Sequence, residues 1–183
     1  MNLRESWVNL LYRVATGTRK SRDLLTPVGV VFFCLFTASF VVAALLVDRL
    51  VPVDWPIPRN ISTLISIPIL GAGIGVTAWS VIHFLRVKGT PVPFNPPPTL
   101  VDSGPYKYAR NPMVTGVFLI LFGTGFAVAS LSLVLVFTPL YILLHLWELK
   151  NIEEPELIRR LGEDYVSYRS RTPMFIPKIR KDR

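Results

Sequence analysis

Two clusters of polar residues stand at the ends of a long apolar segment in this chain. The first, residues 104–112, reads Gly-Pro-Tyr-Lys-Tyr-Ala-Arg-Asn-Pro, and the second contains the neighbouring Glu153 and Glu154. The intervening residues 111–147 include no charged side chain. Glutamates suit a ligand that carries an ammonium or a sulfonium, and an arginine suits a carboxylate. The pattern therefore indicates a polar site at the mouth of an apolar bundle.

Both clusters also have a structural interpretation. Asn111 is a good N-cap, Pro112 is a good first helical residue, and Arg110 can anchor a span among lipid headgroups. Pro155 suits the first turn of another helix, whose N-terminus favours the negative charge of the nearby glutamates. The residues alone leave the structural and the functional interpretation open.

The apolar residues are gathered into runs long enough to cross a membrane. The hydrophobic fraction is 51% and the mean hydropathy is +0.45, which is high for a soluble domain. Residues 24–47 and 60–85 each exceed the about 20 residues that a span requires. Residues 111–147 would form one helix of roughly 55 Å, too long for a hydrocarbon core of about 30 Å. This run is therefore predicted to be two spans joined by a tight turn near residues 129–132.

Charge and periodicity define the segments around the spans. The net charge of +8 comes from basic residues beside apolar runs, which favours anionic lipid headgroups over nucleic acid as the partner. Residues 1–23 are expected to contain an interfacial amphipathic helix, and residues 155–168 an amphipathic helix after the last span. Basic residues favour cytoplasmic placement of both termini and of the Pro-rich loop at 86–100.

These observations predict an all-α, polytopic membrane helical bundle. It would have four transmembrane helices, an N-terminal interfacial helix and a C-terminal cytoplasmic amphipathic helix. Three parts are expected along the chain: an interfacial segment at 1–23, the first two transmembrane helices at 24–85, and a core at 86–183 with the Pro-rich loop, the helical hairpin and the C-terminal helix.

An ordered set of short motifs in the second half of the chain resembles a known family. The motifs are Gly-Thr-Pro at 89–91, Gly-Pro-Tyr-Lys-Tyr-Ala-Arg-Asn-Pro-Met at 104–113, Glu-Glu-Pro-Glu-Leu at 153–157, Gly-Glu-Asp-Tyr at 162–165, Tyr168, and Pro-Met-Phe-Ile-Pro at 173–177. Together they resemble the isoprenylcysteine carboxyl methyltransferase and phospholipid methyltransferase superfamily of integral membrane enzymes. The resemblance covers about residues 86–177, and the first two spans match only in hydropathy.

The resemblance implies an S-adenosylmethionine pocket at the cytoplasmic face and a lipophilic methyl acceptor. The residues expected to bind the cofactor are Gly104, Tyr106, Tyr108, Arg110, Asn111, Pro112, Glu153 and Glu154. Arg110 and Glu153 are the candidate catalytic residues: the first would hold an anionic acceptor, and the second would take a proton from an amine. No metal ligands are assigned.

The acceptor stays open between a prenylated cysteine carboxylate, a phospholipid amine and a small lipophilic thiol. Val114 stands where the family usually has a tyrosine, which bears on substrate identity. An NADPH-dependent membrane reductase of the sterol reductase type is an alternative, because those enzymes share an Arg-His-Pro-like segment before a hairpin. A non-catalytic membrane binding protein of the same fold is the third interpretation.

Two further predictions concern access to the site. The five prolines of residues 86–100 exclude a helix, so this loop is expected to pack over the cofactor as a partial lid. Pro68 and Gly71, Gly73 and Gly75 are expected to leave a gap between the second span and the hairpin, through which the acceptor enters from the bilayer. On that view Gly73→Leu would obstruct the acceptor and spare the cofactor.

Overall fold

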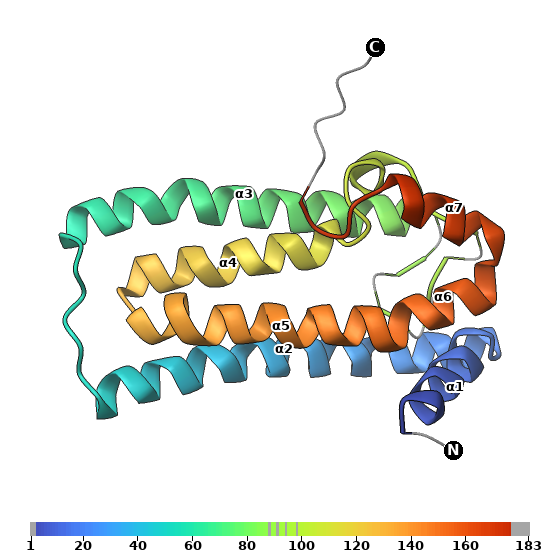
Figure 1. Ribbon diagram of the computed structural model, residues 1–183, viewed down its shortest axis with the longest axis horizontal. Helices are drawn as coiled ribbons and strands as arrows, with labels where there is room; N and C mark the ends of the chain where they lie inside the picture. Colours follow the sequence, from blue (N-terminus) through green and yellow to red (C-terminus); the bar gives the residue numbers. More distant parts are fainter. Residues whose placement is uncertain (1–2, 88, 91, 94, 98, 177–183) are drawn as a thin grey trace, which may run out of the picture.

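The chain folds as a bundle of antiparallel helices in a computed structural model that describes residues 3–87, 89–90, 92–93, 95–97 and 99–176 (Figure 1). The described residues are helical or irregular, without a strand. The helices are α1 (Leu3–Ala15), α2 (Arg19–Leu50), α3 (Arg59–Arg86), the 3-10 turn η1 (Gly104–Lys107), α4 (Pro112–Val128), η2 (Leu133–Phe137), α5 (Thr138–Glu148), η3 (Leu149–Glu153), α6 (Glu154–Leu161) and α7 (Glu163–Arg171).

Among the described residues, three helical segments are long and apolar enough to cross a membrane: Arg19–Leu50, Arg59–Arg86 and Leu133–Leu161. The next helix in length, α4, is an apolar helix of 17 residues and is about 25 Å long at 1.5 Å per residue. The first of these helices begins five residues before the predicted start at residue 24. Thr18 explains the earlier start, because its side chain caps the helix by accepting from the Ser21 amide.

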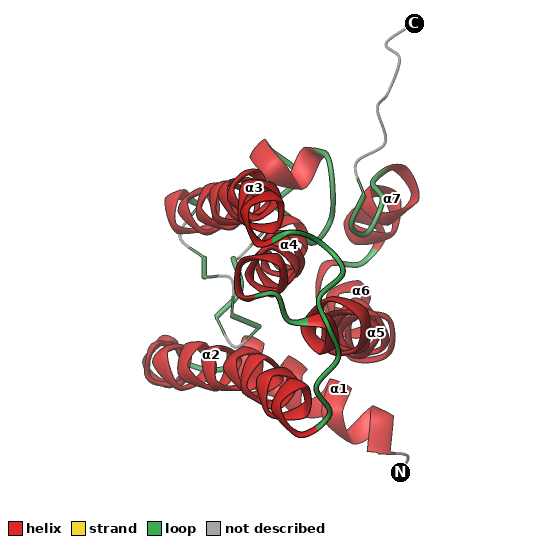
Figure 2. Ribbon diagram, turned by 90° about the vertical axis from the view of Figure 1, so that its left-hand side faces the viewer, coloured by secondary structure: helices red, strands yellow, loops and turns green. Residues whose placement is uncertain are grey.

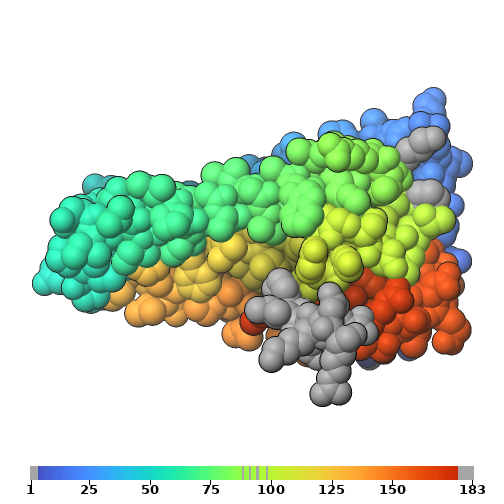
Figure 3. Space-filling model, turned by 90° about the horizontal axis from the view of Figure 1, so that it is seen from above, coloured from blue at the N-terminus to red at the C-terminus, as the bar shows by residue number. Residues whose placement is uncertain are grey.

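The two ends of the bundle differ in what they carry (Figures 1 and 2). One end, called the tip end, holds residues 51–58 and the turn between α4 and η2. The other end, called the site end, holds α1, the Pro-rich loop, η1, α6 and α7. Figure 3 shows the yellow-green loop and η1 residues beside the orange and red C-terminal helices at this end. Polar segments that are far apart in sequence therefore gather at the site end.

The predicted hairpin in residues 111–147 is confirmed. The chain reverses at Ala129, which adopts a left-handed conformation with φ 55°. Asp48, at the end of α2, accepts hydrogen bonds from the Ser130 hydroxyl and, at 3.0 Å, from the Ser132 amide. Arg59 donates to the Val128 carbonyl at 3.0 Å. The turn is thus tied to the ends of both preceding helices.

The closest helix pair in the bundle is α3 with α4. A Cβ on Gly73 would lie 2.8 Å from the Gly116 carbonyl oxygen and 2.9 Å from the Ile120 side chain, whereas Gly71 and Gly75 face open space. The predicted gap between the second span and the hairpin is therefore wrong at Gly73. Small residues at this position serve close helix approach, because they let two backbones touch.

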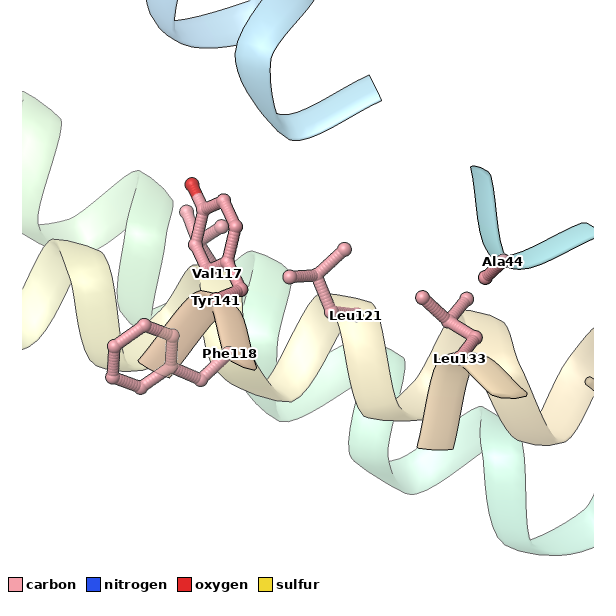
Figure 4. Close-up of a cluster of buried hydrophobic side chains, with 6 residues drawn as sticks. All are labelled: Ala44, Val117, Phe118, Leu121, Leu133 and Tyr141. Atoms are coloured by element: carbon pink, nitrogen blue, oxygen red, sulfur yellow. The ribbon is translucent and has the colours of Figure 1, made fainter. Parts of the chain in front are cut away.

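A buried apolar cluster joins α4 and α5 to α2. Its members are Ala44, Val117, Phe118, Leu121, Leu133 and Tyr141 (Figure 4). Phe36 and Phe40 of α2 pack on the Tyr141 ring with centroids 5.7 and 5.1 Å apart. Much of α2 beyond this cluster stays exposed, including Phe32 and Leu35. Lipid would cover these apolar side chains in a membrane.

The C-terminal region corrects the prediction of one amphipathic helix over residues 155–168. The last long helix runs without a break through Pro155 to Leu161, and Gly162, with φ 61°, separates it from α7. A proline inside a helix removes a hydrogen bond and clashes with the carbonyl four residues earlier. The π-helical turn η3 widens the backbone just before Pro155, and η2 does the same before Pro139.

Candidate functional site

A cavity lies at the site end, between the Pro-rich loop, the η1–α4 segment and α6–α7. It holds about 140 Å³, which is less than the roughly 300–1,000 Å³ of ligand pockets in general. The residues that line it are Leu11, Phe84, Thr90, Val92, Pro93, Pro96, Pro97, Thr99, Leu100, Val101, Tyr106, Arg110, Asn111, Met113, Val114, Glu153, Glu156, Leu157, Arg160, Leu161, Tyr165 and Tyr168. A mainly apolar wall with a few charged groups is typical of a small-molecule site.

Glu153 contributes a carboxylate to this wall from the π-helical turn η3. Two arginines of the cavity already have partners, since Arg110 pairs with Glu154 at 2.6 Å and Arg160 with Glu156 at 2.8 Å. Among the described residues, no hydrogen bond or ion pair engages the Glu153 carboxylate. Its carboxyl group is therefore available to pair with the cationic part of an incoming ligand.

Tyr106 is the buried tyrosine of the η1 turn and faces the cavity. Phe84 packs edge-on against its ring with centroids 4.6 Å apart. Its carbonyl oxygen accepts from the Tyr168 hydroxyl at 2.7 Å. Burial raises the pKa of Tyr106, and the charge of Glu153 raises it further. Its hydroxyl therefore stays protonated and can donate a hydrogen bond.

Gly104 shapes the η1 turn without lining the cavity. Its φ of 58° lies in the left-handed region, and a Cβ there would come within 2.7 Å of the His83 ring. His83 is fixed by a 3.0 Å contact between its Nε2 and the Ser103 hydroxyl. A glycine is required here because both the backbone conformation and the space exclude a side chain.

Tyr108, Pro112 and Glu154 also lie outside the cavity lining. Tyr108 is 50% exposed and lies near Trp79 on the outside of the bundle. Pro112 begins α4, as the structural interpretation of this motif expects. Glu154 is buried as the partner of Arg110. Of the eight residues expected at the cofactor, the structure brings Tyr106, Arg110, Asn111 and Glu153 to the cavity wall.

Four further ionisable residues of the wall had no site role in the sequence analysis: Glu156, Arg160, Tyr165 and Tyr168. Tyr165 and Tyr168 are buried on α7, and burial raises the pKa of both hydroxyls. The Arg160 guanidinium donates to Glu156 and, at 3.3 Å, to the Pro97 carbonyl of the loop. The signal that could have identified the two tyrosines is their position in the motifs Gly-Glu-Asp-Tyr (162–165) and Tyr168.

The Pro-rich loop forms the outer wall of the cavity. The amide and hydroxyl of Thr90 both donate to the Asn95 carbonyl, at 2.9 and 3.0 Å. Gly89 packs directly on Pro97, where a Cβ would meet the ring at 2.8 Å. The Asn95 side chain donates to Asp23 of α2 at 3.1 Å. Among its described residues, the loop therefore has internal hydrogen bonds and a side-chain hydrogen bond to α2.

Fold and site together define a helical membrane protein with a polar, small-molecule cavity at one end of its bundle. A family model described as phospholipid methyltransferase matches residues 62–164. The chain therefore belongs to the phospholipid methyltransferase family, within the superfamily of membrane methyltransferases that its motifs resemble.

One curated relative is the methanethiol S-methyltransferase of Crocosphaera subtropica (strain ATCC 51142 / BH68). It is 31% identical over 100 residues, which is 55% of this chain. The matched region is 35% of the relative, so the chain spans about a third of that protein's length. No solved structure matches this chain.

Proposed function

We propose that the protein transfers a methyl group from S-adenosylmethionine to a lipophilic acceptor at the cytoplasmic face of a membrane. The family match and the order of the motifs support methyl transfer. The observation that carries the choice of cofactor is the Glu153 carboxylate, which has no ion-pair partner among the described residues and lines the cavity. S-adenosylmethionine bears a sulfonium and an ammonium against one carboxylate, so its cationic part complements the Glu153 carboxyl group.

The residues of the cavity fit such a cofactor. Glu153 would neutralise its cationic part, and Asn111 and Tyr106 supply groups that can hydrogen-bond its polar edges. When bound, S-adenosylmethionine supplies an electrophilic methyl group on a positively charged sulfur. The cavity is small relative to such a ligand, so binding requires the outer wall to move. The Pro-rich loop is the wall that can move as a lid. The side-chain hydrogen bonds from Asn95 to Asp23 and from Arg160 to the Pro97 carbonyl can open without unwinding a helix.

The chain's own part in methyl transfer is to position the reactants and exclude water. Met113, Val114 and Leu157 give the inner wall an apolar lining that suits an alkyl chain or a small thiol. A thiol or amine acceptor must lose a proton, and Glu153 is the carboxylate of the wall that can take it. Val114, in place of a tyrosine, leaves this part of the wall apolar.

Four membrane crossings are part of this proposal, with both termini in the cytoplasm. The helices α2, α3 and α4 and the segment Leu133–Leu161 run antiparallel, and α1 and α7 lie at the same end of the bundle (Figure 1). Cysteine labelling from outside sealed membranes should place Asp102 and Lys150 on the same side. Labelling of these two positions from opposite sides would overturn the four-span arrangement.

The acceptor is expected to enter from the bilayer between α2 and the Pro-rich loop, since α3 and α4 are closed at Gly73. An open groove there is lined by Asp23, Thr26, Pro27, Val30, Val31, Thr90 and Asn95. Thr90 also lines the cavity, so the groove and the cavity adjoin at the loop. The name of the relative favours a small thiol among the three acceptor classes. A panel of an alkyl thiol, a phospholipid amine and a prenylcysteine would identify the class.

Titration of the purified protein with S-adenosylhomocysteine and with NADPH tests the proposed function. S-adenosylhomocysteine should bind to the wild-type protein. Glu153→Gln should weaken the binding of S-adenosylhomocysteine or S-adenosylmethionine by about 1–3 kcal/mol, the value of a charge-assisted interaction. Glu163→Gln is the matched control, because Glu163 is exposed at the start of α7. Binding of NADPH alone would support the reductase alternative, and binding of neither would support a non-catalytic protein.

A further inference from the structure

We infer that Arg110 is a positioning residue, which holds α7 and the C-terminal strap against the cavity and acts on ligand binding through them. The strap is defined as residues 172–175. This inference rests on the proposed function, because the ligand concerned is S-adenosylmethionine. It assigns Arg110 and Glu154 a role different from the direct contact that the motif resemblance implies.

The Arg110 guanidinium is engaged on three sides. Its Nη1 donates to the carbonyl oxygens of Arg169 and Thr172, both at 2.9 Å, and its Nη2 donates to Glu154 Oε1 at 2.6 Å. The Arg169 carbonyl belongs to the last turn of α7, where helical carbonyls lack intrahelical partners, and the Thr172 carbonyl belongs to the first residue of the strap. The fixed fork of an arginine can satisfy them and a carboxylate together, which a lysine cannot. Arg110 thereby joins the start of α6 to the end of α7.

Glu154 completes this arrangement from the opposite side. Its Oε1 faces Arg110, and its Oε2 lies 3.6 Å from Arg169 Nη1. The side chains of Arg110 and Glu154 are 11% and 9% exposed, so water screens this ion pair little. Of the two arginine partners of Glu154, Arg169 lies on α7 and Arg110 binds the end of α7. Glu154 itself does not line the cavity. The Glu154 carboxylate therefore binds side chains of the protein and does not face the ligand cavity.

The strap continues the attachment along the start of α4. The Arg110 amide donates to the Pro173 carbonyl at 2.8 Å, and the Asn111 amide donates to the Met174 carbonyl at 3.0 Å. The Phe175 ring packs on Phe118 of the buried cluster, with centroids 5.2 Å apart. The chain after α7 is thus bound to Arg110 through both its backbone and its side chain.

The element held in this way carries part of the cavity wall. Tyr165 and Tyr168 of α7 line the cavity, and the Tyr168 hydroxyl donates to the Tyr106 carbonyl. If α7 moved away, the cavity would lose both tyrosines and the support of Tyr106. Loss of Arg110 should therefore weaken ligand binding even where the guanidinium does not touch the ligand.

A direct contact is the competing explanation, because Arg110 lines the cavity and its Nε–H is buried without a partner among the described residues. The two explanations differ in the ligand-free protein. Only the positioning role requires α7 and the strap to loosen when the side chain is removed and no ligand is present.

Hydrogen exchange on the ligand-free protein in nanodiscs makes this distinction. Arg110→Met should speed exchange at the Asn111 and Thr172 amides at least about tenfold, with α3 unchanged, because these bonds then open locally. Arg171→Met is the matched control. It removes the 2.7 Å ion pair between Arg171, the last residue of α7, and Asp102. The two side chains of this pair are 52% and 48% exposed. It should leave exchange at those amides unchanged within about twofold, since exposed pairs contribute little.

Binding and kinetics supply the second part of the test. Arg110→Met should weaken S-adenosylhomocysteine binding by about 10–100-fold and raise the KM for S-adenosylmethionine, while kcat at saturation stays within about threefold. A variant that was only less folded would lower kcat and leave the affinity of the folded fraction unchanged. Glu154→Gln should weaken binding on its own, but by less than about threefold in the Arg110→Met background, because the two residues act as one unit.

Tyr168→Phe provides a milder variant in case Arg110→Met does not fold. It removes the hydroxyl bond to Tyr106 and should speed strap exchange and weaken S-adenosylhomocysteine binding a few-fold. Unchanged strap exchange in both variants, or independent losses from Arg110→Met and Glu154→Gln, would overturn the positioning role. A wild-type protein that does not bind S-adenosylhomocysteine would overturn the proposed function instead, while the ligand-free exchange would still decide the role of Arg110.

Discussion

The helices α2 and α3 have similar apolar sequences but pack in different ways. The helix α3 lies along α4, with Gly73 against the Gly116 backbone and Leu70 against Gly123. The helix α2 meets the bundle through Phe36, Phe40 and Ala44, and much of its remaining surface is exposed. Hydropathy therefore identifies a membrane span, whereas the small residues decide how closely a second helix can approach.

This contrast has a functional meaning in the proposed enzyme. The pair of α3 and α4 is a fixed support for the η1 turn and for Arg110 and Asn111. Between α2 and the Pro-rich loop lies an open groove, which borders the cavity at Thr90. The tightly packed side of the bundle would hold the site in place, and the loosely packed side would admit the acceptor. Four predictions test this division.

The largest effect is expected from filling the contact between α3 and α4. Gly73→Leu should destabilise the folded protein by about 3 kcal/mol or more, because an overpacked contact must push two backbones apart. Gly75→Leu is the matched control, since a Cβ at Gly75 meets no atom within 4 Å. Thermal unfolding in detergent measures both. Equal stability of the two variants would show that α3 and α4 are not closed at Gly73.

The second effect concerns the tie between α2 and the hairpin turn. Asp48→Ala leaves the Ser132 amide and the Ser130 hydroxyl without their shared acceptor, which should cost about 1–3 kcal/mol. Asp54→Ala, at an exposed carboxylate of the same connection, should cost less than about 0.5 kcal/mol. The same unfolding assay measures both variants. A small loss at Asp48 would mean that apolar contacts alone hold α2 in place.

The sequence predicted the parts of the fold that depend on length and charge. The uncharged run of residues 111–147 had to reverse because it exceeds the bilayer, and the turn occurs at Ala129 within the expected residues. The second span, predicted at residues 60–85, is α3 with one more residue at each end, and the proline content of residues 86–100 predicted the interruption of helix there. These features follow from the thickness of the bilayer and from local backbone sterics, and both can be applied to a single sequence.

The parts that could not be predicted depend on which neighbour a side chain meets. Gly71, Gly73 and Gly75 differ only in the face of α3 that they occupy, and only the position of α4 distinguishes them. Tyr106 and Tyr108 are two residues apart, yet one is buried and the other is exposed. Pro155 suggested a helix start, but the preceding π-helical turn lets the helix continue through it.

The third prediction tests the groove between α2 and the loop. Val31→Trp should narrow the groove and raise the KM of a lipophilic acceptor by about tenfold, or ~1.4 kcal/mol, with S-adenosylhomocysteine affinity unchanged. Val28→Trp is the control, because Val28 is exposed on the same helix outside the groove. Steady-state kinetics with each reactant varied separately measures the effect. An equal rise for both variants would mean that the acceptor does not pass through this groove.

The smallest effect is expected at the tie between the loop and α2. The hydrogen bond from the Asn95 side chain to Asp23 is exposed and joins the loop to α2. Its loss in Asn95→Ala should cost less than about 1 kcal/mol, since water competes for both groups. Exchange at the Thr90 amide should then become about two- to threefold faster, because its acceptor is the Asn95 carbonyl. Thr99→Ala, at an exposed loop position, serves as the control.

The same measurement decides whether the loop is a lid. If the loop closes over the cofactor, S-adenosylhomocysteine should slow exchange at Thr90 in the wild type and in Asn95→Ala, because the cavity wall becomes ordered around the ligand. If the loop is only a connector, the ligand should leave exchange at Thr90 unchanged while it protects Tyr106 and Asn111. Protection of the loop by ligand, together with its faster opening in Asn95→Ala, would locate the movable wall on the side of α2. Protection of α3 alone would place the moving element on the side that the packing at Gly73 closes.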